Sequence, residues 1–376
     1  MFAVRGPVVE IDLSALRHNY AVLDKRCAGR PVIAVVKADA YGHGAVAVAL
    51  ALEAAGVYSF GVAFLSEAVE LRLAGIKKPV HVLFDSPNPE AIVRYALTPV
   101  VRNETDCRIL SDYALSKNIR IKVHVDIDTG MGRLGFAYDE CDDKLINLTV
   151  FKGIEVTGFM SHFSEADLHN RDFAQHQLDR FIEIREVVSQ YYKGALWHFA
   201  NSAAVLSLPA SHFDAVRPGL MLYGCSPMVY QSDINCDGLK PVMTVKSRFV
   251  DIRKVSNGKS ISYGRTFITK RDSLIGVLSV GYADGYPRML SNIGRVIVNG
   301  KYAPIIGRVC MDLTMVDLTD ISDFNENTEV TLIGSDGQCK ITACDLAALS
   351  GTIPYEIVTS LGRNKNKKYL YQQHTN

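Results

Sequence analysis

The feature that most limits the fold of this chain is a repeated alternation of short apolar runs with helical patterns. It extends from about residue 11 to about residue 235, and its apolar runs include VIAVV, YSFGVA, PVHVLFD, LTPVV, IRIKVHVDID, VTGFM, ALWHFAN and DAVRPGL. Strand–helix–strand repetition favours a parallel sheet. About eight such units suggest an α/β fold of the (β/α)8 TIM barrel type, whose active site lies at the C-terminal ends of the strands. An open doubly wound sheet is the alternative.

The pattern changes after about residue 240, where MTVKSRFVDI alternates with period two and TEVTLIG reads as a further strand. RVIVNGKYAPII predicts a hairpin with its turn at Asn299 and Gly300. This half reads as all-β with one helix near TACDLAALSG, and the tail GRNKNKKYLYQQHTN reads as a solvated end. The predicted division is an N-terminal strand at 1–10 packed on the β domain, a barrel at 11–236 and a mainly β C-terminal domain at 237–376, with the linker in CSPMVYQSDINCDG.

Composition narrows the class of protein. The 376 residues are 48% hydrophobic and carry a formal charge of +1, which indicates a globular protein with no electrostatic reason to bind nucleic acid or an anionic membrane. No apolar run approaches the 18 or so residues of a membrane span, and the N-terminus lacks the apolar core of a signal peptide. Eight irregularly spaced Cys without a C-x-x-C pair indicate reduced thiols, and so a cytoplasmic protein.

Lys37 stands at the end of an apolar strand, in VIAVVKADAYGHG. A Lys is almost never fully buried without a partner, so a salt bridge or an exposed strand end is the ordinary explanation. The functional reading is an amine at the barrel mouth, where desolvation lowers its pKa and suits it to a Schiff base with an aldehyde.

The segment around Lys37 resembles that of the alanine racemases, which carry pyridoxal 5'-phosphate (PLP) on a fold-type-III barrel. AVVKADAYGHG looks like their cofactor-lysine signature. DTGMGRLG, SHF, NSAA, RPGLMLYG, SYGRTF, GYADGYPR, GRVCMD and IPYEI then occur in the family's order across both predicted domains. The resemblance implies an isomerase that interconverts L- and D-alanine and supplies D-alanine for the peptidoglycan of the cell wall.

The resemblance implies two bases on opposite faces of the substrate. Lys37 holds the cofactor and, once freed, becomes one base, while PLP acts as the electron sink. Tyr263 of SYGRTF is the other base, and a Tyr needs neighbours that favour its ionised form. The family pattern assigns that help to His162 and Arg217. Arg217 also faces the pyridine nitrogen, where a guanidinium that only donates hydrogen bonds disfavours protonation of the ring.

The same resemblance assigns the remaining contacts. Besides Lys37, His162 and Arg217, the implied cofactor-binding residues are Tyr41, Arg133, Asn201, Ser202, Gly219, Leu220 and Tyr355. The implied substrate-binding residues are Arg133, Met311, Tyr282, Cys310 and Asp312. In the family the second-base Tyr and the Met of CMD come from the other subunit, which implies a homodimer with shared active sites.

One position departs from the family pattern. Many members have a carbamylated Lys seven residues before the Arg of DTGMGRLG, and here that position is Asp126. We expect the Asp126 carboxylate to replace the carbamate beside Arg133. Asp126 and Asp128 face the same way on one strand, but no His or further carboxylate has matching spacing, so no metal site is expected.

Other readings stay open on the sequence. A broader-spectrum or serine-preferring racemase shares the fold, but typically carries an export signal. A fold-type-III decarboxylase would lack Tyr263 in SYGRTF. A PLP-homeostasis protein is the non-enzyme alternative, and it has a lone barrel without the predicted β domain. A barrel without any cofactor is the remaining option.

Overall fold

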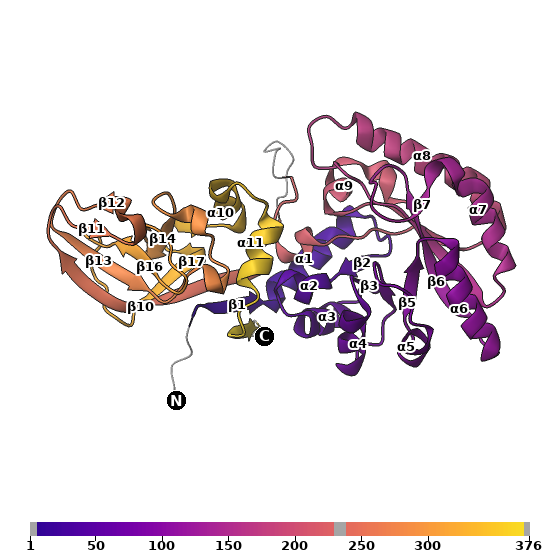
Figure 1. Ribbon diagram of the computed structural model, residues 1–376, viewed down its shortest axis with the longest axis horizontal. Coiled ribbons are helices and arrows are strands. Elements are labelled where there is room, and N and C mark those ends of the chain that lie inside the picture. The colour runs from indigo at the N-terminus through magenta and orange to yellow at the C-terminus, as the bar shows by residue number, and fades with distance from the viewer. Residues whose placement is uncertain (1–5, 229–237, 372–376) are drawn as a thin grey trace.

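The computed structural model describes residues 6–228 and 238–371, arranged as two domains side by side along the long axis of the molecule (Figure 1). The barrel lies at one end and a β domain at the other, with α10 and α11 between them (Figure 1). The chain enters through the β domain, because β1 (Val8–Asp12) pairs with β10 (Met243–Val255). Across the described ranges, no helix has both the length and the apolar character needed to cross a membrane.

Seven parallel strands form the barrel wall in the order β2, β3, β4, β5, β6, β8, β9. Their bounds are Ile33–Val35, Ser59–Val62, Val80–Val82, Thr98–Val101, Ile121–Asp128, Ile154–Met160 and Leu196–His198. β7 (Phe136–Ala137) pairs only with β6. The eighth position is filled by residues 214–218, because single parallel bridges join Val216 to Val32 and Ala215 to His198. The predicted DAVRPGL strand therefore closes the barrel as two bridges rather than a full strand.

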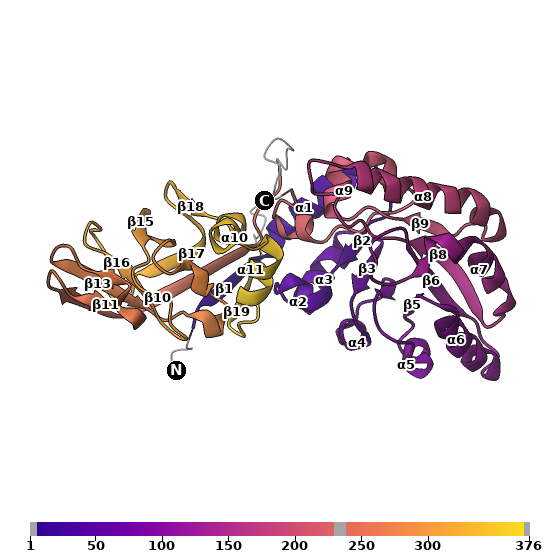
Figure 2. The ribbon, with the colours of Figure 1, turned by 45° about the horizontal axis from the view of Figure 1, so that its top comes forward.

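Helices cover the outer face of this barrel (Figure 2). Several of them begin at polar caps: Asp12 caps α1, Asn88 caps α5 and Asn103 caps α6 through side-chain oxygens that accept from first-turn amides. The helices of this domain are α1 (Leu13–Arg26), α3 (Ala45–Ala54), α4 (Leu65–Leu73), α5 (Pro89–Arg94), α6 (Glu104–Ser116), α7 (Cys141–Asn147), α8 (Asp172–Val188) and α9 (Ser202–Ser207).

The β domain is a nine-stranded sheet built around the long strand β10, which pairs with β1, β13 and β17. The predicted hairpin is confirmed: β14 and β15 are antiparallel, and Asn299 and Gly300 both have positive φ, as its tight turn requires. The other elements are β11 (Ser260–Ile261), β12 (Phe267–Ile268), β13 (Ser273–Leu278), β14 (Arg295–Val298), β15 (Lys301–Pro304), β16 (Thr314–Asp317), β17 (Glu329–Asp336), β18 (Cys339–Ile341), α10 (Ala343–Ser350) and α11 (Pro354–Leu361).

Two details of the sequence-based picture were wrong. The C-terminal half holds a second helix, α11, because Pro354 starts a new helix directly after α10. The tail is not wholly solvated: Lys367–Leu370 forms β19, which pairs in parallel with β1 at the edge of the sheet. Its Lys-rich composition suits an edge strand as well as a disordered tail. The predicted linker at 225–238 lies mostly outside the described residues.

Candidate active site

The site begins with a left-handed turn directly after the first barrel strand. β2 ends at Val35, and Lys37 opens the short α2 (Lys37–Tyr41). Ala38, Asp39, Ala40 and Tyr41 all have φ near +53 or +54. Left-handed helical backbone costs about 1–2 kcal/mol for each such residue that is not Gly. The turn therefore needs support from the rest of the fold, and it places Lys37 at the C-terminal end of the strand.

Two acidic side chains hold this turn. Glu67, at the start of α4, accepts the Ala38 amide at 2.6 Å and the Ala63 amide at 2.7 Å. Asp39 accepts the Ala45 amide at 2.7 Å and pairs with Lys367 of β19 at 2.8 Å. The ion pair with β19 of the β domain thus stabilises the turn that follows β2 of the barrel.

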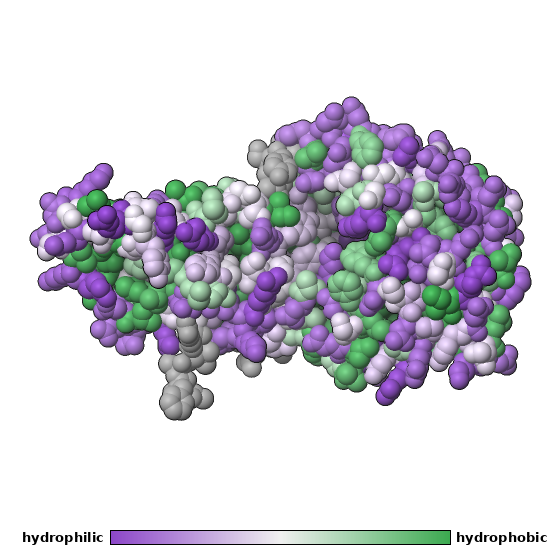
Figure 3. Space-filling model, viewed as in Figure 1, coloured by the Kyte–Doolittle hydropathy of each residue, from purple (hydrophilic) through white to green (hydrophobic). Residues whose placement is uncertain are grey.

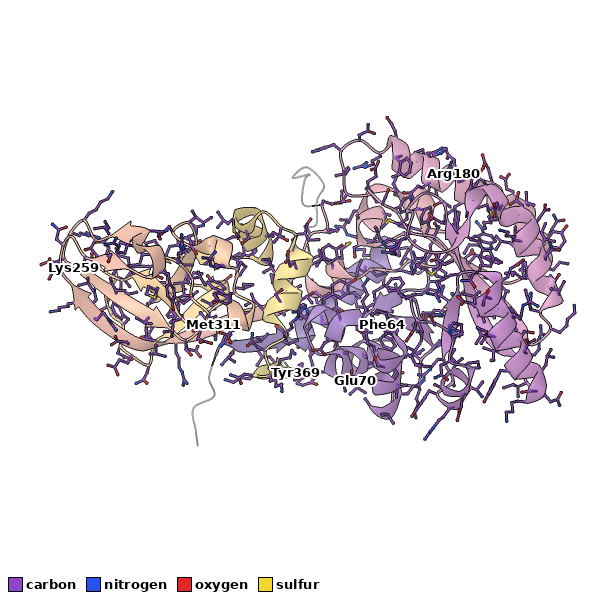
Figure 4. The ribbon with its side chains drawn as sticks, viewed as in Figure 1. Phe64, Glu70, Arg180, Lys259, Met311 and Tyr369 are labelled. Carbon is purple, nitrogen blue, oxygen red and sulfur yellow. The ribbon has the colours of Figure 1, made fainter. Side chains whose placement is uncertain are left out.

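Gly42 and Gly44 follow the turn where the two domains meet. A Cβ on Gly42 would lie 2.6 Å from the Val358 carbonyl of α11, and one on Gly44 would overlap the Tyr369 hydroxyl. Both residues also have positive φ. Figure 4 shows Tyr369 at the foot of the junction between the domains. The glycines of YGHG therefore permit close approach between the domains as well as the backbone bend.

A cavity of about 220 Å³ lies at the C-terminal ends of the barrel strands. Every residue predicted to bind the cofactor lines it: Lys37, Tyr41, Arg133, His162, Asn201, Ser202, Arg217, Gly219, Leu220 and Tyr355. Sequence reasoning missed its remaining lining, which is Val35, Leu83, Phe84 and Met160. These four residues stand at or just after the C-terminal ends of β2, β4 and β8. Their position at the strand ends was the sequence signal that could have predicted them.

Phe84 lies under the two cations at the mouth of the cavity. Lys37 Nζ is 5.0 Å, and the Arg133 guanidinium carbon 5.1 Å, from the centre of its ring. Burial lowers the pKa of Lys37, and the nearby charge of Arg133 lowers it further. Both effects favour the neutral amine, which is the form that attacks a carbonyl or accepts a proton.

Arg217 is buried and held entirely by neutral acceptors. Its NH1 donates to His198 Nδ1 at 2.7 Å and to the His198 carbonyl at 2.6 Å. Its NH2 donates to the Ser161 carbonyl and, at 3.2 Å, to that of Phe199. Burial lowers the pKa of Arg217 to about 10, so the guanidinium remains charged at neutral pH.

A chain of imidazoles continues from Arg217 into the barrel. Because His198 Nδ1 accepts from Arg217, its Nε2 carries the hydrogen, which it donates to His124 Nδ1 at 2.8 Å. The His124 ring packs on His81 at 4.4 Å, and His81 Nε2 lies 3.1 Å from the Ser59 hydroxyl. Burial, and then the charge of Arg217, lowers the pKa of His81 to about 4, so this imidazole is neutral.

Small polar groups gather at the opposite end of the cavity. The Ser202 hydroxyl oxygen accepts the Gly219 amide at 2.9 Å, so its own O–H remains available as a donor. Asn201 Oδ1 accepts the Ala204 amide at 3.0 Å and caps α9. The rings of Tyr41 and Tyr355 are 5.9 Å apart, and burial raises the pKa of both phenols. Protonated hydroxyls of this kind are hydrogen-bond donors suited to a phosphate.

Asp126 is a buried residue of β6, and Arg217 and Arg133 are the cations near it. Burial raises the pKa of Asp126 to about 7, although the charges of Arg217 and Arg133 oppose that rise. This carboxylate therefore changes charge near neutral pH, in the position where the family pattern carries a carbamate.

Of the predicted site residues in the C-terminal half, Tyr355 of α11 lines this cavity, whereas Tyr263, Met311, Tyr282, Cys310 and Asp312 do not. Tyr263 and Met311 are 71% and 53% exposed, and Tyr282 is 43% exposed. They lie together on one part of the β domain, because the Tyr282 amide donates to the Cys310 carbonyl and Cys310 Sγ lies 3.5 Å from the hydroxyl of Ser262. Figure 4 shows Met311 over the β domain and Phe64 over the barrel, and Figure 3 shows hydrophobic residues interrupting the polar surface of the β domain.

Cys310 and Asp312 flank Met311 in the chain, and Asp312 likewise lies outside the lining of the Lys37 cavity. The single chain thus presents two groups of predicted site residues. The barrel group surrounds the Lys37 cavity and includes Tyr355, which α11 contributes, and the other group lies on the β domain.

The barrel group fits PLP. A neutral amine suits the aldehyde, the Arg217 end suits an unprotonated ring nitrogen, and the Ser202, Tyr41 and Tyr355 hydroxyls suit the phosphate. Gly219 is part of this fit, since a Cβ there would overlap the Tyr41 hydroxyl and displace it from the cavity.

Comparisons with known proteins agree with this geometry. Residues 11–227 match the family model described as "Alanine racemase, N-terminal domain", and residues 242–369 match "Alanine racemase, C-terminal domain". The alanine racemase of Thermodesulfovibrio yellowstonii is 45% identical over 97% of this chain and 98% of its own length.

Two solved structures carry relevant ligands. The alanine racemase of Bartonella henselae with covalently bound pyridoxal phosphate has a TM-score of 0.87 and 30% identity, over 98% of this chain and 100% of that one. The alanine racemase of Bacillus anthracis with bound L-Ala-P has a TM-score of 0.90 and 33% identity, over 99% and 97%.

Proposed function

The chain belongs to the alanine racemase family through both of its domains, and from this premise we propose that it interconverts L- and D-alanine with Lys37 and Tyr263 as the two bases. It is accordingly a PLP-dependent isomerase. The observation that carries the site assignment is the cavity around Lys37, where ten residues from separate strands and loops converge.

Lys37 is the base on one face of the substrate. When bound, PLP supplies the electron withdrawal that makes the hydrogen on the α-carbon of an amino acid acidic. Burial and Arg133 keep the Lys37 amine ready to take that proton. The Ser202, Tyr41 and Tyr355 hydroxyls would hold the phosphate of PLP, and Arg217 would bind its ring. His162, whose pKa burial and the neighbouring cations lower, stays a neutral hydrogen-bonding group.

Tyr263 is the base on the other face, supplied by a second copy of the chain. Its 71% exposure and its absence from the Lys37 cavity support this arrangement, because a second base must reach the substrate opposite Lys37. Met311 and its neighbours Cys310, Asp312 and Tyr282 then arrive with Tyr263. In this assembly the Met311 amide and Arg133 bind the substrate carboxylate, and Asp126 supplies negative charge beside Arg133 in place of a carbamate.

We also propose the domain boundaries, the cellular compartment, the assembly and the substrate of the enzyme. The chain divides at about residues 10 and 236, with β1 belonging to the β domain. The enzyme works in the cytoplasm as a homodimer and supplies D-alanine for peptidoglycan. L-alanine is its substrate, which the L-Ala-P in the Bacillus anthracis relative supports.

A mixed-dimer experiment tests the shared site. Lys37→Ala and Tyr263→Phe homodimers are prepared separately, then dissociated and reassembled together. If Tyr263 serves the partner's Lys37, each mixed dimer holds one site with both bases, and racemisation of L-alanine reappears. If both bases act within one chain, mixing restores nothing. Assays of the unaltered enzyme with L-alanine, L-serine and L-lysine establish the preferred substrate.

A further inference from the structure

A second cavity, of about 410 Å³, lies at the junction of the two domains, away from the Lys37 site. The barrel side contributes His43, Tyr223 and the exit segment 224–226, and the β domain contributes parts of β10, β17, β18, α10 and α11. Its volume falls within the range of about 300–1,000 Å³ found for small-molecule sites. The walls are mixed, with an apolar part formed by Leu239, Pro241, Met243, Ile333, Ile341, Ala343 and Val358 and a polar part that includes Ser226, Thr244, Ser335, Lys340 and Thr342.

His43 gives this cavity one defined polar group. The residue is fully buried, and its Nδ1 lies 3.0 Å from each of the Ala40 and Tyr41 carbonyl oxygens. Two acceptors there require the hydrogen on Nδ1, so Nε2 presents a lone pair. Within the described residues, Nε2 has no hydrogen-bond partner. Its ring stacks on Tyr223 at 4.4 Å, which fixes the direction of that lone pair.

From this geometry we infer that the cavity binds a small uncharged molecule with a hydrogen-bond donor on an apolar body, such as a phenol, an alcohol or an amide. The donor bonds to His43 Nε2 and the body fills the apolar space. No carboxylate is present among the described residues of the lining, so a cation has no counter-charge there. The one ionisable cation of the lining, Lys340, is exposed, and a buried lone pair repels the oxygens of an anion.

Water alone is a poor occupant of this space. One water molecule occupies about 30 Å³ of liquid and needs two to four polar partners to be held well. A single water satisfies His43, but much of the remaining wall consists of apolar side chains that hold no water. Displacing such loosely held water with an apolar group is favourable.

Ligand-observed NMR on the PLP-loaded enzyme tests the inference with phenol as the probe and anisole as its matched control. Both have the same ring, but anisole has no donor. We expect phenol to bind at least about tenfold more tightly, as one hydrogen bond to a buried acceptor implies. Equal binding of the two, or no binding of phenol, overturns the proposal, and so does competition between phenol and L-alanine in the racemisation assay.

Two variants locate the probe. Thr244→Phe places an aromatic side chain in the cavity from β10 and should abolish phenol binding, whereas Val250→Phe, exposed on the same strand, should leave it unchanged. Retained binding in Thr244→Phe overturns the proposal. If Thr244→Phe fails to fold, a crystal of the unaltered enzyme soaked in phenol decides: phenol on His43 supports the site, and water alone there refutes it.

Discussion

The guanidinium of Arg217 lies 2.7 Å from His198, NH1 to Nδ1, in the buried interior of the barrel. This contact sets the tautomer of His198 and, through it, that of His124. The orientation of Arg217 at the cofactor cavity therefore depends on imidazoles that do not line the cavity themselves.

The first prediction concerns this support. His198→Phe keeps a ring in the barrel but removes the acceptor for Arg217, leaving a buried donor unsatisfied. The free energy of unfolding should fall by about 1–3 kcal/mol, and PLP should bind more weakly. Denaturant unfolding and cofactor titration measure both effects. His169→Phe, at an exposed loop position, is the control and should change neither quantity.

Lys37→Ala should fold but lose its covalent hold on the cofactor. The visible absorbance of bound PLP should disappear after gel filtration, and racemisation should fall by at least about 10²-fold, because the variant also lacks one base. Lys77→Ala, an exposed lysine of the barrel, should keep both properties. Absorbance that stays with the Lys37→Ala protein would show that another amine holds the cofactor.

Tyr263→Phe should keep PLP and lose racemisation by about 10²–10⁴-fold. The two enantiomers have equal free energy, so kcat/KM should fall equally from L- and from D-alanine. The phenyl ring preserves the shape of the side chain and removes only the hydroxyl. Initial rates measured from each enantiomer provide the comparison. Unchanged turnover in both directions would remove Tyr263 from the role of second base.

Asp126 should give the protein a pH-dependent stability. Its folded-state pKa of about 7 exceeds the ordinary value of about 4, so the folded chain holds this proton more tightly than the unfolded chain. The resulting stabilisation is full below about pH 4 and is lost as the pH rises to about 7. Asn does not ionise, so Asp126→Asn does not lose this stabilisation. The difference between its urea midpoint and that of the unaltered protein should therefore shift in favour of the variant as the pH rises from about 4 to about 7.

The matched control for this titration is Asp112→Asn, at an exposed position on α6, which should follow the unaltered protein at every pH. Parallel pH profiles for Asp126→Asn and the unaltered protein would contradict the assignment of the titrating group.

Glu67→Ala should weaken the left-handed turn. It removes the acceptor of the Ala38 and Ala63 amides, so both stability and PLP affinity should fall, the former by about 1–3 kcal/mol. Glu70→Ala is the control, since Glu70 lies on the same helix and points into solvent (Figure 4). Equal cofactor affinity in the two variants would mean that the turn holds Lys37 without Glu67.

Local patterns predicted much of the fold. The strand–helix alternation indicated the barrel, and Asn299-Gly300 indicated the hairpin of the β domain, because both features arise from neighbouring residues. The left-handed turn escaped prediction, since Ala38, Asp39 and Ala40 carry no local signal for positive φ and depend on Glu67, which is distant in sequence. β19 escaped for a similar reason, because its pairing with β1 joins opposite ends of the chain.

The sequence likewise predicted one part of the candidate site and missed another. The barrel residues were predicted by motif, and the cavity brings them together. The imidazole chain was missed, although His81, His124 and His198 all stand on strands of the barrel, and that recurrence of His was the available signal. Whether Tyr263 meets Lys37 depends on a second chain, and no pattern within one sequence encodes that contact.

The bond between Asp39 and Lys367 has a consequence for the order of events during synthesis. Lys37 and its turn leave the ribosome well before Lys367 and Tyr369, which close that turn. The growing chain can build most of its barrel while the lysine still lacks its final support. The turn therefore receives this support only after Lys367 has emerged, and a chain that stops before Lys367 lacks it.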